Sequence, residues 1–229
     1  MAYEQIEFPG ADGKPIPGWL FRPKGKSGIG VCMVHDVFGL RGDYEDVVAP
    51  FVEHGYVVLL PDIFYKTEPL YDVDEKGNKK KHYRGLFNTE EGMVVLKAAV
   101  RKLKGMPETG GRVGVTGYCL GGTLSYLAAA RLGEVGASAG YYATNAHGYL
   151  DEAKNIRQPL YLHMAETDRT HTPEDAERVR QTLKDIAQAR CFVYPKCVHG
   201  FANNEHPGYN VEMTRLANER TFELFDKIK

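Results

Sequence analysis

The sequence of 229 residues predicts an α/β fold in which a mostly parallel, twisted sheet carries helices on both faces and begins with a short antiparallel hairpin. Short continuous apolar runs, such as residues 30–34 and 56–60, are typical of strands that are buried on both faces. Segments with apolar residues at helical spacing alternate with these runs. Strands that alternate with helices favour a parallel sheet covered on both sides.

The first quarter of the chain supplies the expected hairpin and the first core strand. Residues 3–8 alternate weakly between polar and apolar side chains, and a glycine-containing turn separates them from a second strand over 16–21. Two strands joined in this way predict an antiparallel hairpin. The core strand at 30–34 then leads into the segment His35-Asp-Val-Phe-Gly39 and a helix with its apolar face over 47–52.

Residues 62–88 form the least regular part of the sequence. This segment is rich in charged and turn-forming residues and contains Lys79-Lys80-Lys81. Two interpretations remain open for it. It is either a solvated excursion or a lid over a functional site, since long loops within compact domains are often functional.

The remainder of the chain continues the alternation of strands and helices. The expected elements are, in order, a helix from Met93 to Leu103, a strand at 112–116, a helix at 120–128, strands at 135–142 and 159–164, a helix that begins at Thr172-Pro173, a strand at 191–194 and a closing helix at 211–229. No repeat or linker divides these elements. The sequence therefore predicts a single domain over residues 1–229.

Composition and charge exclude several functional classes. The net charge of -1 and the pI near 6.7 give no electrostatic case for binding nucleic acid or a membrane surface. No apolar run approaches the roughly 18 residues of a membrane span. The four cysteines form no C-x-x-C pair, and the eight histidines form no metal-binding motif. We therefore expect a cytoplasmic protein without metal or cofactor, present as a monomer or a small homo-oligomer.

The most informative stretch is Gly117-Tyr118-Cys119-Leu120-Gly121-Gly122, which lies between an expected strand and an expected helix. A tight strand-to-helix turn strains its central residue, and only small neighbours allow the chain to close there. This is the nucleophile-elbow pattern with cysteine in place of serine. The following helix N-terminus favours a thiolate at Cys119. The alternative is a buried structural cysteine in a glycine-rich turn.

A thiol nucleophile needs a base, and the base needs an orienting partner. Asp168 and His199 each follow an expected strand, and they occur in the chain order nucleophile, acid, histidine. The backbone N–H of Leu120 is the expected first donor to an oxyanion. The second donor is expected in the loop after residue 34, at Asp36 or Val37.

Other residues compete for these roles. Ser138 satisfies G-x-S-x-G within residues 136–140, but no helical stripe follows directly. Asp151 and Asp175 could replace Asp168, although the first precedes its strand and the second lies in a helix start. His163 and His206 are interpreted as structural, because one lies within a strand and the other after the closing turn.

Together, the cysteine-centred elbow, the Asp168 and His199 loops and the segment from His35 to Gly39 resemble the dienelactone hydrolase family (carboxymethylenebutenolidases), which has the α/β-hydrolase fold. The resemblance covers essentially the whole chain. It implies a Cys119–His199–Asp168 triad that hydrolyses an enol-lactone or an activated ester. It also implies that the N–H of Val37 is the second oxyanion donor.

The sequence departs from the family pattern near the substrate. Better-studied members carry a Glu that contacts the resting thiol, and the matching residue here is the shorter Asp36. Those members also bind the substrate carboxylate with two arginines. Arg84 is the candidate for the first, whereas Asn203 occupies the place of the second. Tyr141 is also expected to contact substrate. Arg41 and Arg169, near the expected site loops, could supply part of the missing charge, and we expect neutral esters or lactones to be accepted.

Cysteine chemistry narrows the expected substrate further. A thiolate is both a good nucleophile and a good leaving group, so esters with stabilised leaving oxygens suit it and amides do not. The sequence therefore predicts hydrolysis of a lactone or an activated ester through a thioacyl-enzyme. A general small-ester carboxylesterase or thioesterase, a non-catalytic ligand-binding protein and a thiol-redox protein remain as alternatives.

Overall fold

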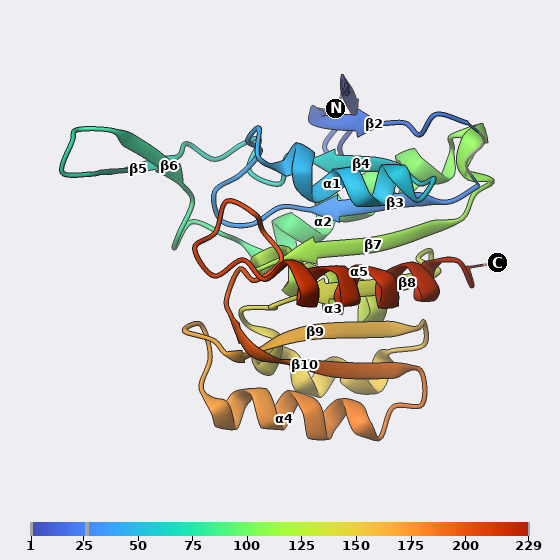
Figure 1. The fold of residues 1–229 in the computed structure, drawn as a ribbon. Coiled ribbons are helices and arrows are strands. Elements are labelled where there is room, and N and C mark those ends of the chain that lie inside the picture. Colours follow the sequence, from blue (N-terminus) through green and yellow to red (C-terminus); the bar gives the residue numbers. More distant parts are fainter. Residues whose placement is uncertain (1, 26–27, 229) are drawn as a thin grey trace.

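A computed structural model describes residues 2–25 and 28–228, and within them the sheet predicted from the sequence is present (Figure 1). Eight strands of these residues pair in the order β1-β2-β4-β3-β7-β8-β9-β10. Their bounds are β1 (Glu4–Pro9), β2 (Pro15–Phe21), β3 (Gly30–Val34), β4 (Val57–Pro61), β7 (Val113–Tyr118), β8 (Ala137–Tyr141), β9 (Leu160–Thr167) and β10 (Ala189–Val198). β1 pairs with β2, and β2 with β4, in antiparallel register. The other neighbours are parallel, which confirms the predicted fold class.

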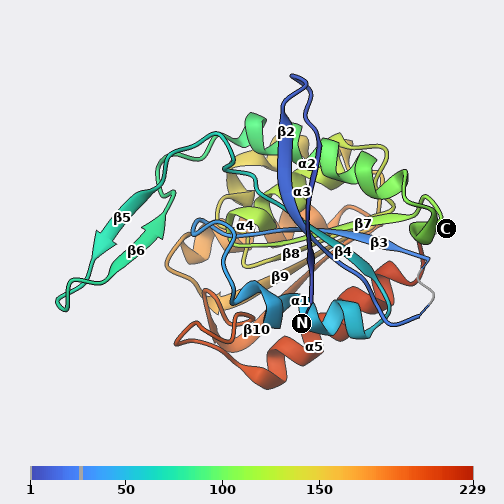
Figure 2. The ribbon, with the colours of Figure 1, turned by 90° about the horizontal axis from the view of Figure 1, so that it is seen from above.

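Helices cover both faces of this sheet (Figure 2). On one face lie α2 (Thr89–Lys104), α3 (Leu120–Arg131) and α4 (Pro173–Lys184), and on the other lie α1 (Tyr44–Glu53) and α5 (Val211–Phe225). Each face has its own cluster of buried apolar side chains. Two 3₁₀ helices that the sequence did not predict, η1 (Pro107–Thr109) and η2 (Ala146–Asn155), complete the connections.

Side-chain caps fix where several helices begin. Thr172 and Asp175 form a reciprocal capping box at α4, with Pro173 in the first turn, as the sequence predicted. Asn88 accepts hydrogen bonds from two backbone N–H groups at the start of α2. Asn210 has the same role at α5, accepting from the N–H of Met213.

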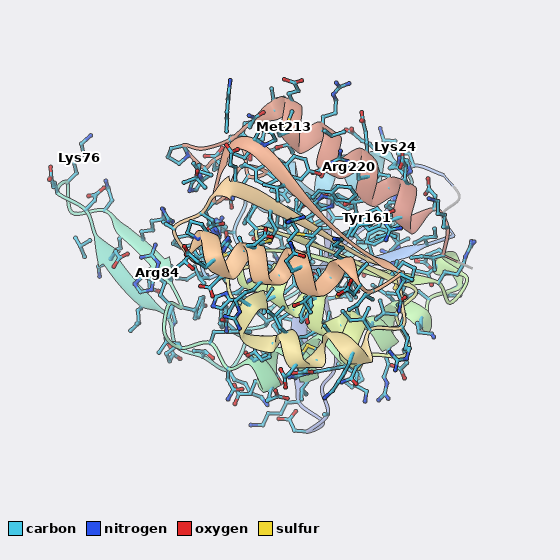
Figure 3. The ribbon with its side chains drawn as sticks, turned by 90° about the horizontal axis from the view of Figure 1, so that it is seen from below. Lys24, Lys76, Arg84, Tyr161, Met213 and Arg220 are labelled. Atoms are coloured by element: carbon cyan, nitrogen blue, oxygen red, sulfur yellow. The ribbon has the colours of Figure 1, made fainter. Side chains whose placement is uncertain are left out.

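The irregular segment 62–88 contains a two-stranded hairpin, β5 (Leu70–Val73) and β6 (Lys79–His82), which protrudes from the body of the protein (Figures 1 and 2). Asp74 builds its turn by accepting hydrogen bonds from the N–H groups of Lys76 and Asn78. Figure 3 shows Lys76 at the tip of the hairpin and Arg84 near its base. The residues of β5 are all exposed, including the apolar Leu70, Tyr71 and Val73, so this short strand does not pack on the core.

The strand register brings four loop residues to one edge of the sheet. His35, Cys119, Asp168 and His199 each immediately follow the last residue of a strand, namely β3, β7, β9 and β10. Thr167 pairs with Val198, so Asp168 and His199 leave adjacent strands at the same level. Val34 of β3 pairs with Gly117 of β7, so His35 and Cys119 leave their strands within one residue of the same level. Parallel strands end at a common edge, and ligand sites in such sheets lie there.

Candidate active site

The turn at Cys119 has the backbone geometry of a nucleophile elbow. Cys119 has φ 60° and ψ −116°, a conformation that L residues other than glycine rarely adopt. A Cβ atom at Gly117 would lie 2.3 Å from the carbonyl oxygen of Gly121. One at Gly121 would lie 2.3 Å from the carbonyl oxygen of Val34. Only glycine therefore fits at these two positions, and the glycines allow β7 and α3 to approach closely enough to hold Cys119 in this conformation.

Asp168 and His199 form a hydrogen-bonded pair beside this elbow. His199 Nδ1 lies 2.8 Å from Oδ2 and 3.0 Å from Oδ1 of Asp168. The N–H and hydroxyl of Thr170 both donate to Asp168 Oδ1. Burial acts to raise the pKa of Asp168, but the contacts with His199 and Thr170 outweigh it and lower this pKa. An ionised Asp168 accepts the Nδ1 proton of His199, which leaves Nε2 available as a base.

Burial favours the neutral form of the Cys119 thiol in the free enzyme. Burial raises its pKa to about 12, and the negative charge of Asp36 acts in the same direction. The backbone N–H groups of Leu120 and Val37 oppose this shift, because they face the sulfur and stabilise its anion. The helix N-terminus acts in the direction that the sequence indicated, because the Leu120 N–H lowers the thiol pKa, but other contributions are larger. Burial of a side chain that is only 7% exposed outweighs the favourable helix end.

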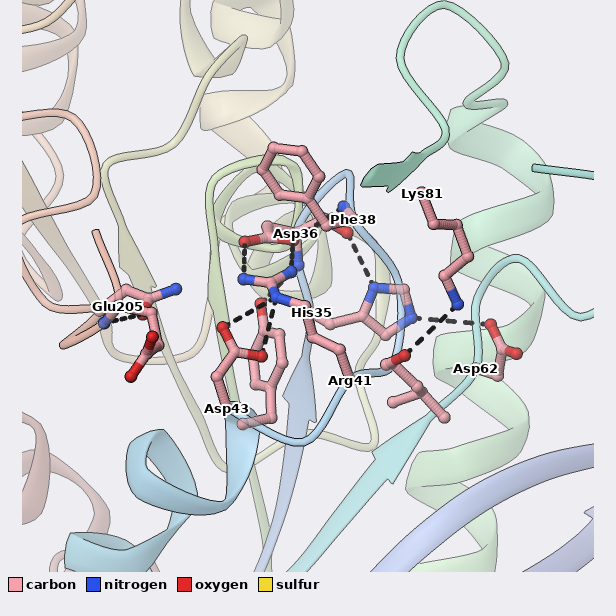
Figure 4. A network of polar contacts seen from close by, with 11 residues as sticks. His35, Asp36, Phe38, Arg41, Asp43, Asp62, Lys81 and Glu205 are labelled. Carbon is pink, nitrogen blue, oxygen red and sulfur yellow. Dashed lines mark hydrogen bonds and ion pairs between the residues drawn. The ribbon is translucent and has the colours of Figure 1, made fainter. Parts of the chain in front are cut away.

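Asp36 is held by an arginine rather than by the thiol. Nη1 and Nη2 of Arg41 donate to its two carboxylate oxygens at 2.6 and 3.0 Å (Figure 4). Arg41 also binds Asp43, and the N–H of Phe38 donates to Asp36 Oδ1 at 2.8 Å. The guanidinium therefore partly neutralises the carboxylate that the sequence assigns to tuning the thiol.

Labelling of the free enzyme with iodoacetamide should reveal this protonation state. Because only the thiolate reacts and its fraction grows about tenfold per pH unit below the pKa, labelling of Cys119 should rise steadily from pH 7 to pH 10. Asp36→Asn removes a negative charge, so it should lower the thiol pKa and speed labelling at each pH. It should also reduce turnover less than His199→Ala does.

Asp43→Asn is the matched control, because Asp43 also binds Arg41 but is not among the charges that shift the thiol pKa. It should change labelling less than Asp36→Asn does. A full-rate plateau between pH 6 and pH 8 would show a resting thiolate and contradict this account, and identical profiles for wild type and Asp36→Asn would remove Asp36 from it.

A cavity of about 320 Å³ joins most of the predicted site residues. Its lining includes Asp36, Val37, Arg84, Cys119, Tyr142, Arg169, His199, Asn203 and His206. Asn203 Oδ1 accepts the N–H of Glu205, and Arg84 donates to Asp72 at 3.0 Å. Both side chains therefore face the cavity with one polar group already bound.

Tyr141 does not line this cavity, which corrects the sequence-based expectation. Its side chain is fully buried, and its hydroxyl donates to Asn218 at 2.9 Å and lies 2.8 Å from the Thr221 hydroxyl, both on α5. Tyr142, the next residue, lines the cavity instead and packs edge-on against the His199 ring. β8 ends at Tyr141, and Tyr142 has φ 36°, so the backbone leaves the extended conformation between the two tyrosines and their side chains take different directions.

The competing residues lie elsewhere or have other partners. Ser138 is in the middle of β8 and fully buried, away from any strand-to-helix turn. His163 is buried between Tyr194 and Thr221, and burial lowers its pKa to about 3. Asp151 lies in η2, and the carboxylate of Asp175 caps α4. His206 does line the cavity, with its Nδ1 accepting the N–H of Gly208.

A larger groove of about 680 Å³ lies between the β1–β2 turn and α2, but the described residues that line it include no Cys, His, Asp or Glu.

In the described part of the chain, no three His, Cys, Asp or Glu side chains gather closely enough to bind a metal ion. Of the helices within residues 2–25 and 28–228, none combines the length and apolar character needed to span a bilayer.

The sheet order, the elbow between β7 and α3 and the loops at the carboxyl edge define an α/β hydrolase. The chain belongs to the dienelactone hydrolase family, because the sequence model of that family matches residues 16–229. It is therefore a hydrolase of the dienelactone hydrolase type.

Individual relatives match along nearly the whole chain. A carboxymethylenebutenolidase of Pseudomonas sp. strain P51 is 28% identical over 236 residues, covering 100% of this chain and 97% of the relative. Another, from Pseudomonas putida, is 26% identical over 228 residues, with 98% and 96% covered. A solved chain from Klebsiella pneumoniae superposes with a TM-score of 0.83 at 20% identity, covering 99% of this chain and 98% of that one.

Proposed function

We propose that this protein hydrolyses lactones or activated carboxylic esters through a Cys119–His199–Asp168 triad and a thioacyl-enzyme. The observation that carries the proposal is the hydrogen bond of His199 to Asp168, together with the cavity that both His199 and the strained elbow residue Cys119 line. A buried carboxylate that orients a histidine beside a nucleophile is the arrangement used for acyl transfer.

The resting geometry suggests how the thiol becomes reactive. The substrate carbonyl oxygen takes over the N–H groups of Leu120 and Val37 that face the sulfur in the free enzyme. The displaced sulfur turns toward His199, whose Nε2 removes its proton. The thiolate then attacks the carbonyl carbon, and the negative charge passes to the oxygen bound by the two N–H groups.

The tetrahedral adduct collapses when the bond between the carbonyl carbon and the leaving oxygen breaks. His199 returns the proton to that oxygen, which stays attached to the acyl chain when the substrate is a lactone. A water molecule then attacks the thioacyl carbon while His199 accepts its proton. The bond between this carbon and the sulfur then breaks, the carboxylic acid leaves, and His199 gives the proton to the departing sulfur, which restores the neutral thiol.

A lysine that lines the cavity favours an anionic substrate, whereas the sequence predicted that neutral esters or lactones are accepted. Arg41 and Arg84 bind carboxylates of the protein, and Asn203 contributes no charge. The Lys80 ammonium lies 4.6 Å from the centre of the Phe38 ring, and it has no carboxylate within 4 Å in residues 2–25 and 28–228. We propose that Lys80, carried by the β5–β6 hairpin, attracts a substrate carboxylate.

Lys80→Gln should therefore lower the preference for a free-acid lactone over its methyl ester. Because Lys80 is exposed, we expect the ratio of the two kcat/KM values to fall by only about 3- to 10-fold. Lys79→Gln is the matched control, since Lys79 is also exposed on β6 but does not line the cavity. Equal ratios in wild type and Lys80→Gln would rule out this role.

Alkylation distinguishes the hydrolase from the alternative functions. The enzyme is treated with iodoacetamide, the modified cysteine is mapped, and hydrolysis of p-nitrophenyl acetate and of a dienelactone is measured. Loss of turnover in step with alkylation of Cys119 supports the proposal. Ligand binding without any turnover would favour a non-catalytic protein, and reversible disulfide formation on adding peroxide would favour a redox role.

We also propose that the enzyme works in the cytoplasm, which is a reducing compartment. There it is present as a monomer or a small homo-oligomer. Its four cysteines are all free of disulfides. A nucleophilic thiol also remains usable only where it is not oxidised or paired.

A further inference from the structure

His35 is buried, and its ring lies close to Asp36, the residue before the proposed oxyanion donor Val37 (Figure 4). It follows the last residue of β3, and its side chain is fully buried. The ring packs against Phe64 with 5.5 Å between the ring centres and meets Tyr44 edge-on. His35 is not among the residues that line the cavity, so its buried polar atoms need another reason to be there.

Both ring nitrogens of His35 bind backbone groups, and these partners fix its proton. Nδ1 lies 2.9 Å from the carbonyl oxygen of Asp36, and Nε2 lies 3.3 Å from the amide nitrogen of Ile63. Oδ1 of Asp62 is farther from Nε2, at 3.8 Å, which is beyond hydrogen-bond distance (Figure 4). A carbonyl oxygen can only accept, so Nδ1 carries the proton and donates it. The Ile63 N–H can only donate, so Nε2 is the acceptor.

The carbonyl of Asp36 and the N–H of Val37 belong to the same peptide unit. That unit is planar and trans, so its C=O and N–H point in opposite directions and cannot turn independently. A hydrogen bond that fixes the oxygen therefore also fixes the N–H that faces the Cys119 sulfur. Donation to the oxygen also polarises the peptide and strengthens its N–H as a donor.

A second contact holds the preceding peptide. The N–H of Asp36 donates to the hydroxyl of Tyr44 at 2.7 Å. The segment before Val37 is therefore anchored at the Asp36 N–H by Tyr44. At the Asp36 C=O it is anchored by His35 at 2.9 Å and by the N–H of Gly39 at 3.2 Å, of which His35 makes the shorter contact. We propose that His35 is a positioning residue that aims the Val37 N–H at the oxyanion of the transition state; this inference rests on the proposed hydrolytic function.

The test compares wild type, His35→Phe and His35→Asn. His35→Phe keeps an aromatic ring against Phe64 but loses the donor, whereas the Asn amide nitrogen can occupy the place of Nδ1. Removal of one oxyanion donor costs about 10²–10³ in kcat, so loss of its orientation in His35→Phe should lower kcat about 10- to 100-fold with KM little changed. His35→Asn should recover most of the lost rate.

A spectroscopic measurement separates this role from a merely structural one. The carbonyl stretch of the thioacyl-enzyme reports hydrogen bonding to the acyl oxygen. It should move to higher wavenumber in His35→Phe and return toward the wild-type value in His35→Asn. If His35→Phe does not fold, His35→Leu replaces it. His163→Leu, which removes a buried histidine outside the cavity, controls for lost stability and should leave kcat and the stretch unchanged.

The possible failures can be told apart. A folded His35→Phe or His35→Leu with wild-type kcat and an unshifted carbonyl stretch would overturn the role of His35 alone. A wild type that hydrolyses esters without any thioacyl-enzyme would refute the proposed function, and the positioning role with it.

Discussion

Cys119→Ala is expected to lower ester and lactone hydrolysis by about 10⁴-fold or more, because the variant has no atom that can form the acyl-enzyme. The protein should still fold, since the change removes one sulfur atom at the edge of a cavity and leaves the elbow glycines in place. The rate is measured with an aryl ester and with a dienelactone, and folding is followed by circular dichroism and thermal unfolding.

Two control variants make this result specific. Cys191→Ala removes another partly buried thiol, which lies in β10 outside the cavity, and should keep full activity. Ser138→Ala should also stay active, because its hydroxyl is buried within β8. An inactive Ser138→Ala together with an active Cys119→Ala would show that the nucleophile lies in the rival motif.

His199→Ala is expected to lose nearly as much activity as Cys119→Ala, and the double variant should be no worse than either single one. Residues of a triad act as a unit, so the losses in free energy do not add. Asp168→Asn should lose about 10²- to 10⁴-fold, because the amide no longer holds the Nδ1 proton of His199 in place. These rates are compared with kcat/KM of the wild type.

The loss of activity in Asp168→Asn tests the contact between Asp168 and His199 most directly. Thr170→Val is its control, since it removes one hydrogen bond to Asp168 but leaves the carboxylate and its contact with His199. It should cost far less than Asp168→Asn. Strictly additive losses in the Cys119 and His199 variants would indicate that the two residues act in separate steps.

The elbow and its partners were accessible from the sequence because their signals are local. Glycines at 117 and 121 mark a close approach of backbone segments, and the structure shows which carbonyl oxygens they approach. Asp168 and His199 follow strands whose parallel pairing was expected from the alternation of elements. Parallel register then brings the two loops together without any further information.

Features that depend on tertiary packing were not accessible. The strands of the β5–β6 hairpin have four residues each and lie in a segment rich in charged and turn-forming residues, so their sequence did not distinguish them from a loop. The choice between Tyr141 and Tyr142 depends on the residue at which β8 ends. The thiol pKa depends on burial by distant segments, whereas the sequence shows only the favourable helix N-terminus.

The contacts of Arg41 also could not be predicted from the sequence. Its position five residues after Asp36 does not reveal that its guanidinium folds back to bind both carboxylate oxygens. The hydrogen bond from His35 to the Asp36 carbonyl likewise depends on the contact of the ring with Ile63 in the loop after β4. Both arrangements need the folded chain to be seen.

The most direct test of the account is to trap the acyl-enzyme. The protein is mixed rapidly with an aryl ester, quenched in acid within the first turnover, digested and analysed by peptide mass mapping. We expect the acyl mass on the peptide that contains Cys119, appearing before steady state and decaying at the turnover rate. Steady hydrolysis with no acyl group on Cys119, or with the acyl group on Ser138, would contradict the central claim.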